Sequence, residues 1–322
     1  MSHFLLKGLA RYTLPGGEKN RLGVLIYHRV LREADALVQD TVANDFDWQL
    51  QTLKRCFNVL PLPEALDRLQ QGELPPGSVA ITFDDGYADN ATVALPLLKR
   101  HGLHATFFIA SGFLDGGRMW NDSVVYALRN TTKSSIEVPA LQSEPISLAT
   151  LDEKRSAIAS LLPKIKYIPE PRRSEVVQAL TEAAGAALPD DLMMSSAQVR
   201  ELRQAGMEIG GHTITHPILA LVPEAEASEQ IGRGREILQG ILGEPISLFA
   251  YPNGVPKRDY LPAHIAAVKA AGFKAAFSTA WGAATRHRDP FQLPRFTPWD
   301  KTPARFALRL ALNGRKTEAR AV

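Results

Sequence analysis

The sequence predicts an α/β fold, a distorted (β/α) barrel of seven or eight parallel strands with an inserted helical or irregular subdomain. Short apolar runs alternate with amphipathic stretches, which is the pattern of strands joined by crossover helices. Glycines follow several of these stretches, where a left-handed residue ends a helix. Polar residues follow several of the apolar runs, and active sites of parallel barrels gather at the carboxyl ends of their strands.

The expected elements take their bounds from these runs and stretches. Apolar residues recur at helical spacing in the stretch that contains Ile231, Leu238 and Ile241. The glycines that follow helical stretches are Gly102, Gly206, Gly243 and Gly272. The expected strands lie at residues 22–28, 57–60, 78–85, 105–111, 207–212, 248–252, 274–279 and 292–296. The expected helices lie at residues 45–55, 63–71, 90–101, 197–205, 224–242 and 260–271.

The alternation also predicts how the chain is divided. We expect an N-terminal extension at 1–21, a barrel at 22–300 with an insertion at about 112–195, and a basic C-terminal helix or tail at 301–322. The insertion contains a cluster of turn residues at 130–135, several prolines and helical segments without clear core strands. It is too long for a structureless loop in a compact domain, so we expect a small subdomain or lid over one rim.

Composition restricts the function classes. A chain of 322 residues with 45% hydrophobic and 22% charged residues can bury one large core, or a core and an insertion. A formal net charge of +3 is a weak field for this length and does not favour a nucleic-acid partner. The single cysteine, Cys56, excludes a disulfide within the chain and a multi-cysteine zinc site. Any metal must therefore be held by histidine and carboxylate, and we expect Cys56 to lie in the core.

The ends of the chain predict peripheral helices. The first residues contain no signal peptide pattern and no stretch of 18 apolar residues occurs, so we expect a cytoplasmic enzyme or one at the cytoplasmic face of the membrane. Residues 4–12 combine apolar side chains with Lys7 and Arg11, and residues 303–316 form a basic amphipathic stretch. We expect helices that pack on the body, with peripheral membrane contact as the alternative. The apolar residues of the first stretch are Phe4, Leu5, Leu6, Leu9 and Tyr12.

The first chemical motif is TFDDG at residues 82–86, an apolar strand that ends on Asp84 and Asp85. Two adjacent buried carboxylates repel each other and cost several kcal/mol unless a cation or a shared proton relieves them. Side chains alternate along a strand, so both reach one centre only where the strand ends, and Gly86 permits that turn. Two solvated aspartates at a strand end would be the alternative.

The second motif is HTITH at residues 212–216, which follows a predicted strand. The β-branched residues between the two histidines and Pro217 after them disfavour a helix, so we place His212 and His216 on a loop. Two histidines alone are more often ordinary loop residues. Two histidines and one carboxylate make three ligands and leave a position for water, which is the composition of a catalytic zinc site.

These motifs, with FAYPNG at residues 249–254, resemble the polysaccharide deacetylase family, also called carbohydrate esterase family 4 or NodB homology. The resemblance covers roughly residues 22–296 apart from the insertion. It implies removal of acetyl groups from N-acetylated sugars with one divalent metal, zinc or alternatively cobalt or nickel. It also implies that Asp84 is the catalytic base and that Asp85, His212 and His216 are the metal ligands.

The resemblance extends to the remaining machinery with two departures. The usual arginine before the third motif and the usual late histidine acid are both missing. His28 resembles the acid of a subgroup that includes exopolysaccharide deacetylases, and Arg295 resembles the arginine that pairs with the base there. The resemblance further implies that the main-chain N–H of Tyr251 stabilises the oxyanion. A structural histidine at position 28 and a packing aromatic at position 251 are the alternatives.

Aromatic residues near the expected site are candidates for stacking on a sugar ring. The segment Trp120-Asn121-Asp122 in the insertion is such a candidate, whereas core or rim packing is the better default for Trp281 and Trp299. The implied partner is an acetylated glycan, in an exopolysaccharide, a lipopolysaccharide precursor or a lipid-linked glycan. The sequence does not predict an oligomeric state.

Three rival functions are weaker. A retaining glycosidase would need its carboxylates about 5 Å apart across a bond, and neighbouring residues beside two histidines suit a metal better. Another metal-dependent amide or ester hydrolase would use the same centre, so O-acetyl esters stay open as substrates. A non-catalytic glycan-binding relative would have lost the base or a ligand, and neither is lost.

Overall fold

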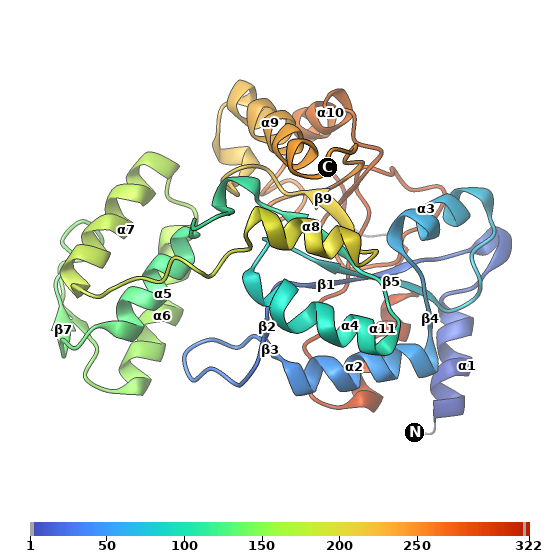
Figure 1. Ribbon diagram of the computed structural model, residues 1–322, viewed down its shortest axis with the longest axis horizontal. Coiled ribbons are helices and arrows are strands. Elements are labelled where there is room, and N and C mark those ends of the chain that lie inside the picture. The colour runs from blue at the N-terminus through green and yellow to red at the C-terminus, as the bar shows by residue number, and fades with distance from the viewer. Residues whose placement is uncertain (1–2, 318–319) are drawn as a thin grey trace.

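The computed structural model describes residues 3–317 and 320–322, and its centre is a parallel sheet (Figure 1). The seven strands follow the order β1-β5-β6-β9-β10-β11, and β4 pairs with the amino end of β5. The strands are β1 (Gly23–Tyr27), β4 (Asn58–Val59), β5 (Ser78–Phe83), β6 (Thr106–Ile109), β9 (Glu208–Gly211), β10 (Leu248–Ala250) and β11 (Ala275–Phe277). A parallel sheet enclosed by helices confirms the predicted (β/α) barrel.

The eighth predicted strand, at residues 292–296, is wrong. This segment forms only isolated parallel bridges, from Leu293 to β11 and from Phe296 to β1. Pro294 between them has no N–H to donate, so a continuous ladder cannot form. Main-chain hydrogen bonds of 2.7–3.0 Å still attach the segment to both edge strands. The segment therefore joins the first and last strands of the barrel without being a strand itself.

Helices cover the outside of the sheet at all six predicted places. The stretch at 90–101 begins with a π-helical turn, Asn90–Ala94, before its α-helix. The helices are α2 (Ala43–Cys56), α3 (Leu62–Gln71), α4 (Leu95–His101), α8 (Ser196–Gln204), α9 (Glu224–Leu242) and α10 (Pro262–Ala270). Cys56, at the end of α2, is free and buried in the core as predicted.

Two terminal helices, α1 (His3–Thr13) and α11 (Pro303–Asn313), lie side by side against α2 (Figure 1). Leu6 and Ala10 of α1 are buried, so the helix packs on the body. Phe4 and Tyr12, on its other face, are exposed. Within the described residues, no helix combines the length and apolar character needed to cross a bilayer.

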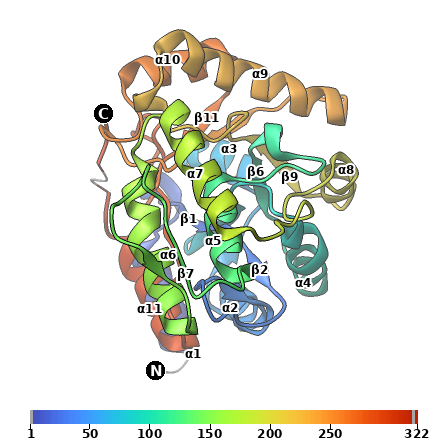
Figure 2. The same cartoon turned by 90° about the vertical axis from the view of Figure 1, so that its left-hand side faces the viewer.

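The inserted segment forms a helical subdomain, here called the lid, that projects from the barrel (Figures 1 and 2). It consists of α5 (Trp120–Asn130), β7 (Ser135–Ile136), β8 (Ile146–Ser147), α6 (Leu151–Lys166) and α7 (Glu170–Ala184). The two short strands pair antiparallel, and the helices enclose an apolar cluster that is separate from the barrel core. A further short parallel pair, β2 (Val30–Leu31) and β3 (Thr41–Val42), precedes α2.

Candidate active site

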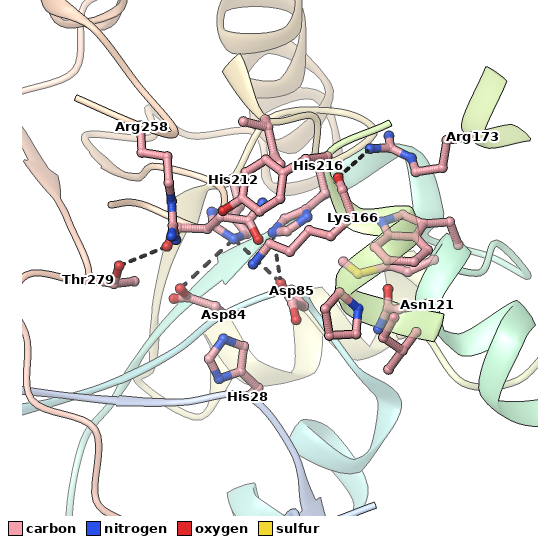
Figure 3. A pocket seen from close by; sticks show the side chains of 17 residues that line it. His28, Asp84, Asp85, Asn121, Lys166, Arg173, His212, His216, Arg258 and Thr279 are labelled. Atoms are coloured by element: carbon pink, nitrogen blue, oxygen red, sulfur yellow. Dashed lines mark hydrogen bonds and ion pairs between the residues drawn. The ribbon is translucent and has the colours of Figure 1, made fainter. Parts of the chain in front are cut away.

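A cavity of about 470 Å³ lies between the carboxyl ends of the barrel strands and the lid (Figure 3). Ligand pockets of small molecules have volumes in this range. The barrel contributes His28, Asp84, Asp85, His212, His216, Asn253 and Thr279. The lid contributes Met119, Trp120, Asn121, Leu162, Pro163, Lys166, Tyr167 and Arg173.

The end of β5 turns both aspartates into this cavity. Asp85 has a φ of 78° and Gly86 a φ of 92°, so the strand stops and the chain reverses directly after Asp84. A Cβ at Gly86 would lie 3.0 Å from the side chain of Ile109, so the close approach to β6 also favours glycine. Left-handed backbone is costly for aspartate, and such strain is typical of functional sites.

The histidine loop is fixed from behind by α9. Thr213 and His216 have φ values of 67° and 54°, so the loop is not a helix. The side-chain oxygen of Gln230 accepts hydrogen bonds of 3.1 and 2.9 Å from two main-chain N–H groups of this loop. A Cβ at Gly234 would lie 2.9 Å from the main chain of Thr213, so α9 approaches closely only because glycine stands there. Neither residue was predicted, because only tertiary packing gives them this role.

Asp85, His212 and His216 come together as a candidate metal site. Their ligand atoms lie within 4.8 Å of one another, and Asp85 Oδ1 is 3.5 and 3.4 Å from the two histidine Nε2 atoms. His212 Nδ1 lies 2.7 Å from the carbonyl of Ala250, which leaves Nε2 for a metal. Asp85 Oδ1 is buried without a hydrogen-bond partner. An orphaned carboxylate oxygen between two imidazoles fits a divalent cation.

The electrostatics of these ligands agree with that fit. Burial tends to raise the pKa of Asp85, but His212 and His216 outweigh it and hold the pKa well below its usual range. Burial lowers the pKa of His216 to about 4. Burial also tends to lower the pKa of His212, but Asp84 and Asp85 outweigh it and raise the pKa. At neutral pH Asp85 is therefore ionised and His216 neutral, as metal ligands must be.

Asp84 forms a buried bidentate pair with Arg295. Arg295 Nη1 and Nη2 lie 2.6 and 2.7 Å from the two carboxylate oxygens. Arg295 also donates to the carbonyl of Ser278 at 3.1 Å and to the hydroxyl of Thr82 at 3.3 Å, which fixes its plane. Burial tends to raise the pKa of Asp84, but Arg295 and His212 outweigh it and lower the pKa. The structure thus places Arg295 where it was predicted.

His28 follows β1 and lines the same cavity near Asp84 (Figure 3). Its main-chain carbonyl accepts a hydrogen bond of 2.8 Å from the side chain of Asn90. Across the described ranges the imidazole itself makes no hydrogen bond or ion pair. The ring is therefore exposed to the cavity, as a proton donor requires.

The structure contradicts the role predicted for Tyr251. Its N–H donates to the carbonyl of Phe277 at 3.1 Å, so it continues the sheet and is not available to an oxyanion. The ring is fully buried, stacks on Tyr260 at 3.9 Å and donates its hydroxyl to the carbonyl of Phe291. Tyr251 is thus a packing residue, which was the alternative.

Asn253, two residues later, has the position that was expected for Tyr251. It lines the cavity and has a left-handed φ of 60°. Among the described residues its main-chain N–H has no acceptor. Thr279 donates to its carbonyl at 2.8 Å and holds the turn. The Asn-Gly pair that begins at Asn253 is a typical left-handed turn signal and would have identified this position in the sequence.

The aromatic candidates divide between the two expectations. Trp120 and Asn121 line the cavity from the lid. Asp122 does not line it, because its buried carboxylate accepts a hydrogen bond of 3.1 Å from the hydroxyl of Tyr87. Trp281 packs on Phe296 with ring centroids 5.6 Å apart, as a rim residue. Trp299 is 64% exposed and lines a neighbouring cavity that shares His28.

Two solved structures share the fold of this chain. The Streptococcus pyogenes deacetylase PplD, in complex with acetate, is 19% identical to this chain, with a TM-score of 0.60. The match covers 92% of this chain and 98% of PplD. IcaB from Ammonifex degensii is 21% identical to this chain, with a TM-score of 0.57. The match covers 93% of this chain and 98% of IcaB. At this identity the likeness shows the fold.

Sequence similarity identifies the family. YxkH of Bacillus subtilis, a protein named for the polysaccharide deacetylases, is 34% identical over 91 residues, which are 28% of this chain and only 32% of that protein. The family model of polysaccharide deacetylases matches residues 71–146 and 173–276, which are more than half of the chain. These matched segments contain both aspartates, both histidines and the turn at Asn253. The chain therefore belongs to the polysaccharide deacetylase family.

Proposed function

We propose that the protein is a metal-dependent hydrolase that removes acetyl groups from N-acetylated sugars of a polysaccharide or lipid-linked glycan. The single observation that carries this proposal is the pair of centres at one cavity. Asp84 with Arg295 lies beside the set of Asp85, His212 and His216. One carboxylate is thereby reserved for proton transfer, and the other is free to bind a cation.

Zinc is the metal we propose, with cobalt or nickel as alternatives. Two imidazoles and one carboxylate are a ligand set of catalytic zinc, with a position left for water or substrate. When bound, such a cation lowers the pKa of a water molecule and polarises an acyl oxygen.

The residues of the chain would then move the protons. Asp84, held ionised and oriented by Arg295, accepts a proton from the water as its oxygen bonds to the acetyl carbon. The main-chain N–H of Asn253 donates to the oxygen that becomes negative. His28 gives a proton to the sugar nitrogen as the C–N bond breaks, and the products are acetate and a free amine.

The substrate we propose is an N-acetylhexosamine unit of an exopolysaccharide, a lipopolysaccharide precursor or a lipid-linked glycan. Trp120 and Asn121 would stack on the ring and bind its hydroxyls from the lid. A non-catalytic glycan-binding protein is disfavoured because the base and all three ligands are in place.

Acetate release from N- and O-acetylated glycans tests this proposal. The purified protein should release acetate from at least one N-acetylated glycan. A chelator should abolish the release, and zinc should restore it. Release that a chelator leaves unchanged would rule out metal dependence, and release from O-acetyl esters alone would reassign the reaction.

A further inference from the structure

The lid side of the cavity carries positive charge that the deacetylation step does not use. Lys166 ends α6, Arg173 lies in α7, and Arg258 lies in the loop between β10 and α10. All three line the cavity, and Lys166 extends into it from the lid (Figure 3). The carboxylates among the lining residues are Asp84 and Asp85 alone, both within the catalytic centre.

Arg173 is a buried cation with little compensation. It is 7% exposed, and its guanidinium lies 5.5 Å from the ring centre of Trp120. Within the described residues, the guanidinium donates a single hydrogen bond, to the carbonyl of Lys166 at 3.5 Å. In the part of the chain that the structure describes, it forms no ion pair with a carboxylate, and Glu170 acts on it only through space without a salt bridge. A guanidinium has five N–H donors, and burying its charge without an anion is costly.

Lys166 is the second cation on this side of the cavity. Its ammonium makes no hydrogen bond or ion pair within the described segments and lies 5.7 Å from the ring centre of Tyr167. Burial lowers the pKa of Lys166. The acid that acts on it electrostatically, Asp259, already accepts hydrogen bonds from Tyr167, Arg258 and the N–H of Val255. Lys166 is therefore open to a ligand in the cavity.

The charges of the catalytic centre do not compensate these cations. Arg295 already neutralises Asp84 through two hydrogen bonds. A divalent cation on Asp85 would leave that side of the cavity positive as well. An uncharged sugar would thus leave two cationic side chains desolvated opposite a cationic centre, whereas an anionic group would relieve both.

We propose that the substrate is an N-acetylated sugar with an oxyanion, a phosphate or a carboxylate, on the same or the adjacent unit, bound by Lys166 and Arg173. This inference rests on the proposed deacetylation and narrows its substrate class. Arginine suits such a group because its planar fork matches two oxygens at once, and lysine adds a point charge. Arg258, which is exposed and paired with Asp259 at 3.2 Å, adds positive charge to the same lining.

The test compares acetate release from three substrates. They are N-acetylglucosamine 1-phosphate, a tetrasaccharide that alternates N-acetylglucosamine with glucuronate, and the neutral N-acetylglucosamine tetramer. The metal-loaded enzyme should show a kcat/KM about tenfold or more higher for an anionic substrate than for the neutral one. Salt of about 0.5 M should reduce that preference. The first two substrates distinguish phosphate from carboxylate as the source of the charge.

Four variants test which residues cause the preference for an anionic substrate. Lys166→Gln and Arg173→Gln should each lower kcat/KM for the anionic substrate about tenfold and change the neutral one less than about twofold. Lys164→Gln and Arg172→Gln are matched controls that remove the same charges from exposed positions of the same helices, and both should leave the preference intact. Equal losses on both substrates would overturn the proposal and make the cations packing residues. Lys166→Gln decides the matter if Arg173→Gln does not fold.

A binding measurement separates this proposal from the deacetylase itself. Absence of acetate release from every substrate would contradict the proposed function. The metal-free protein, prepared with a chelator, is titrated with N-acetylglucosamine 1-phosphate and, in parallel, with the uronate tetrasaccharide. The affinities measure anion binding by Lys166 and Arg173 without any need for turnover. At least one anionic ligand should bind wild type about tenfold more tightly than either glutamine variant. Equal affinity of wild type and variants for both would overturn the oxyanion site.

Discussion

Arg295 donates one hydrogen bond to each carboxylate oxygen of Asp84, at 2.6 and 2.7 Å, and both side chains are buried. Arg295 lies in the segment that connects β1 with β11, and Asp84 directly follows β5, so the pair links these two parts of the barrel. It fixes the orientation of the proposed base and keeps it ionised, because the cation offsets the burial of the carboxylate.

The Asp84→Asn variant should keep the metal and lose turnover. The amide has the shape of the carboxylate but cannot accept the proton, and the three proposed ligands are unchanged. We expect kcat to fall by about 10²–10⁴-fold. Zinc content per chain and acetate release measure the two effects. A fully active variant would disprove the role of Asp84.

The Arg295→Met variant should be less stable than wild type, and its activity should fall off at a higher pH on the acidic side. Removing one partner of a buried ion pair typically costs about 3–5 kcal/mol of unfolding free energy. Without the arginine, burial dominates and the pKa of Asp84 rises, so the acidic limb of the pH–rate profile should move to higher pH. In wild type the lowered pKa gives stability that is present above the unfolded-state pKa and is lost as pH falls. Denaturant unfolding and a pH–rate profile check both effects, and an unmoved acidic limb would contradict the pairing argument.

The His28→Ala variant should discriminate between leaving groups. A sugar amine must be protonated as the C–N bond breaks, whereas the phenolate of an activated acetate ester leaves without a proton. We expect a loss of about 10²-fold or more for the amide and a much smaller loss for the ester. Equal losses on amide and ester would indicate a structural histidine.

The Tyr251→Phe variant should keep kcat and lose only a little stability. The phenol hydroxyl donates one hydrogen bond to the carbonyl of Phe291, at 3.1 Å, so its removal should cost about 1 kcal/mol of unfolding free energy.

The Asn253→Gly variant should also stay active, because glycine keeps the N–H and tolerates a φ of 60°. Thermal melting and acetate release measure both variants. A large drop in kcat for Tyr251→Phe would contradict the packing role of its side chain, because phenylalanine keeps the main-chain N–H and loses only the hydroxyl.

Local pattern predicted much of the centre, because strand ends and chemical motifs coincide there. TFDDG at 82–86 and HTITH at 212–216 stand where apolar strands stop, and the barrel brings those ends together. The errors arose at boundaries. The strand predicted at 248–252 ends at Ala250. The family resemblance placed the oxyanion donor at Tyr251, whereas the N–H that we propose for this role belongs to Asn253.

The lid cations could not be predicted in this way. Lys166 and Arg173 belong to an insertion that contributes no strand to the barrel sheet, so no strand end of the barrel marks them. Which face of α6 and α7 meets the cavity depends on how the lid packs on the barrel through Tyr167 and Asp259, residues that are far apart in the sequence. Gln230 and Gly234 were missed for the same reason, since they act only through the packing of α9 on the histidine loop.

Metal binding should weaken as pH falls, with His212 as the main cause. Asp84 and Asp85 raise the pKa of His212 in the metal-free protein, so a metal competes with a proton for this imidazole. His216, with a pKa of about 4, and Asp85 are already deprotonated at neutral pH. We expect zinc uptake to release a proton and the apparent affinity to decline from pH 8 to pH 5. Calorimetry in buffers of different ionisation enthalpy measures the proton, and an affinity that is constant over this range would contradict the assignment. His212→Ala should lose zinc and turnover together, whereas His104→Ala, an exposed histidine before β6, should lose neither.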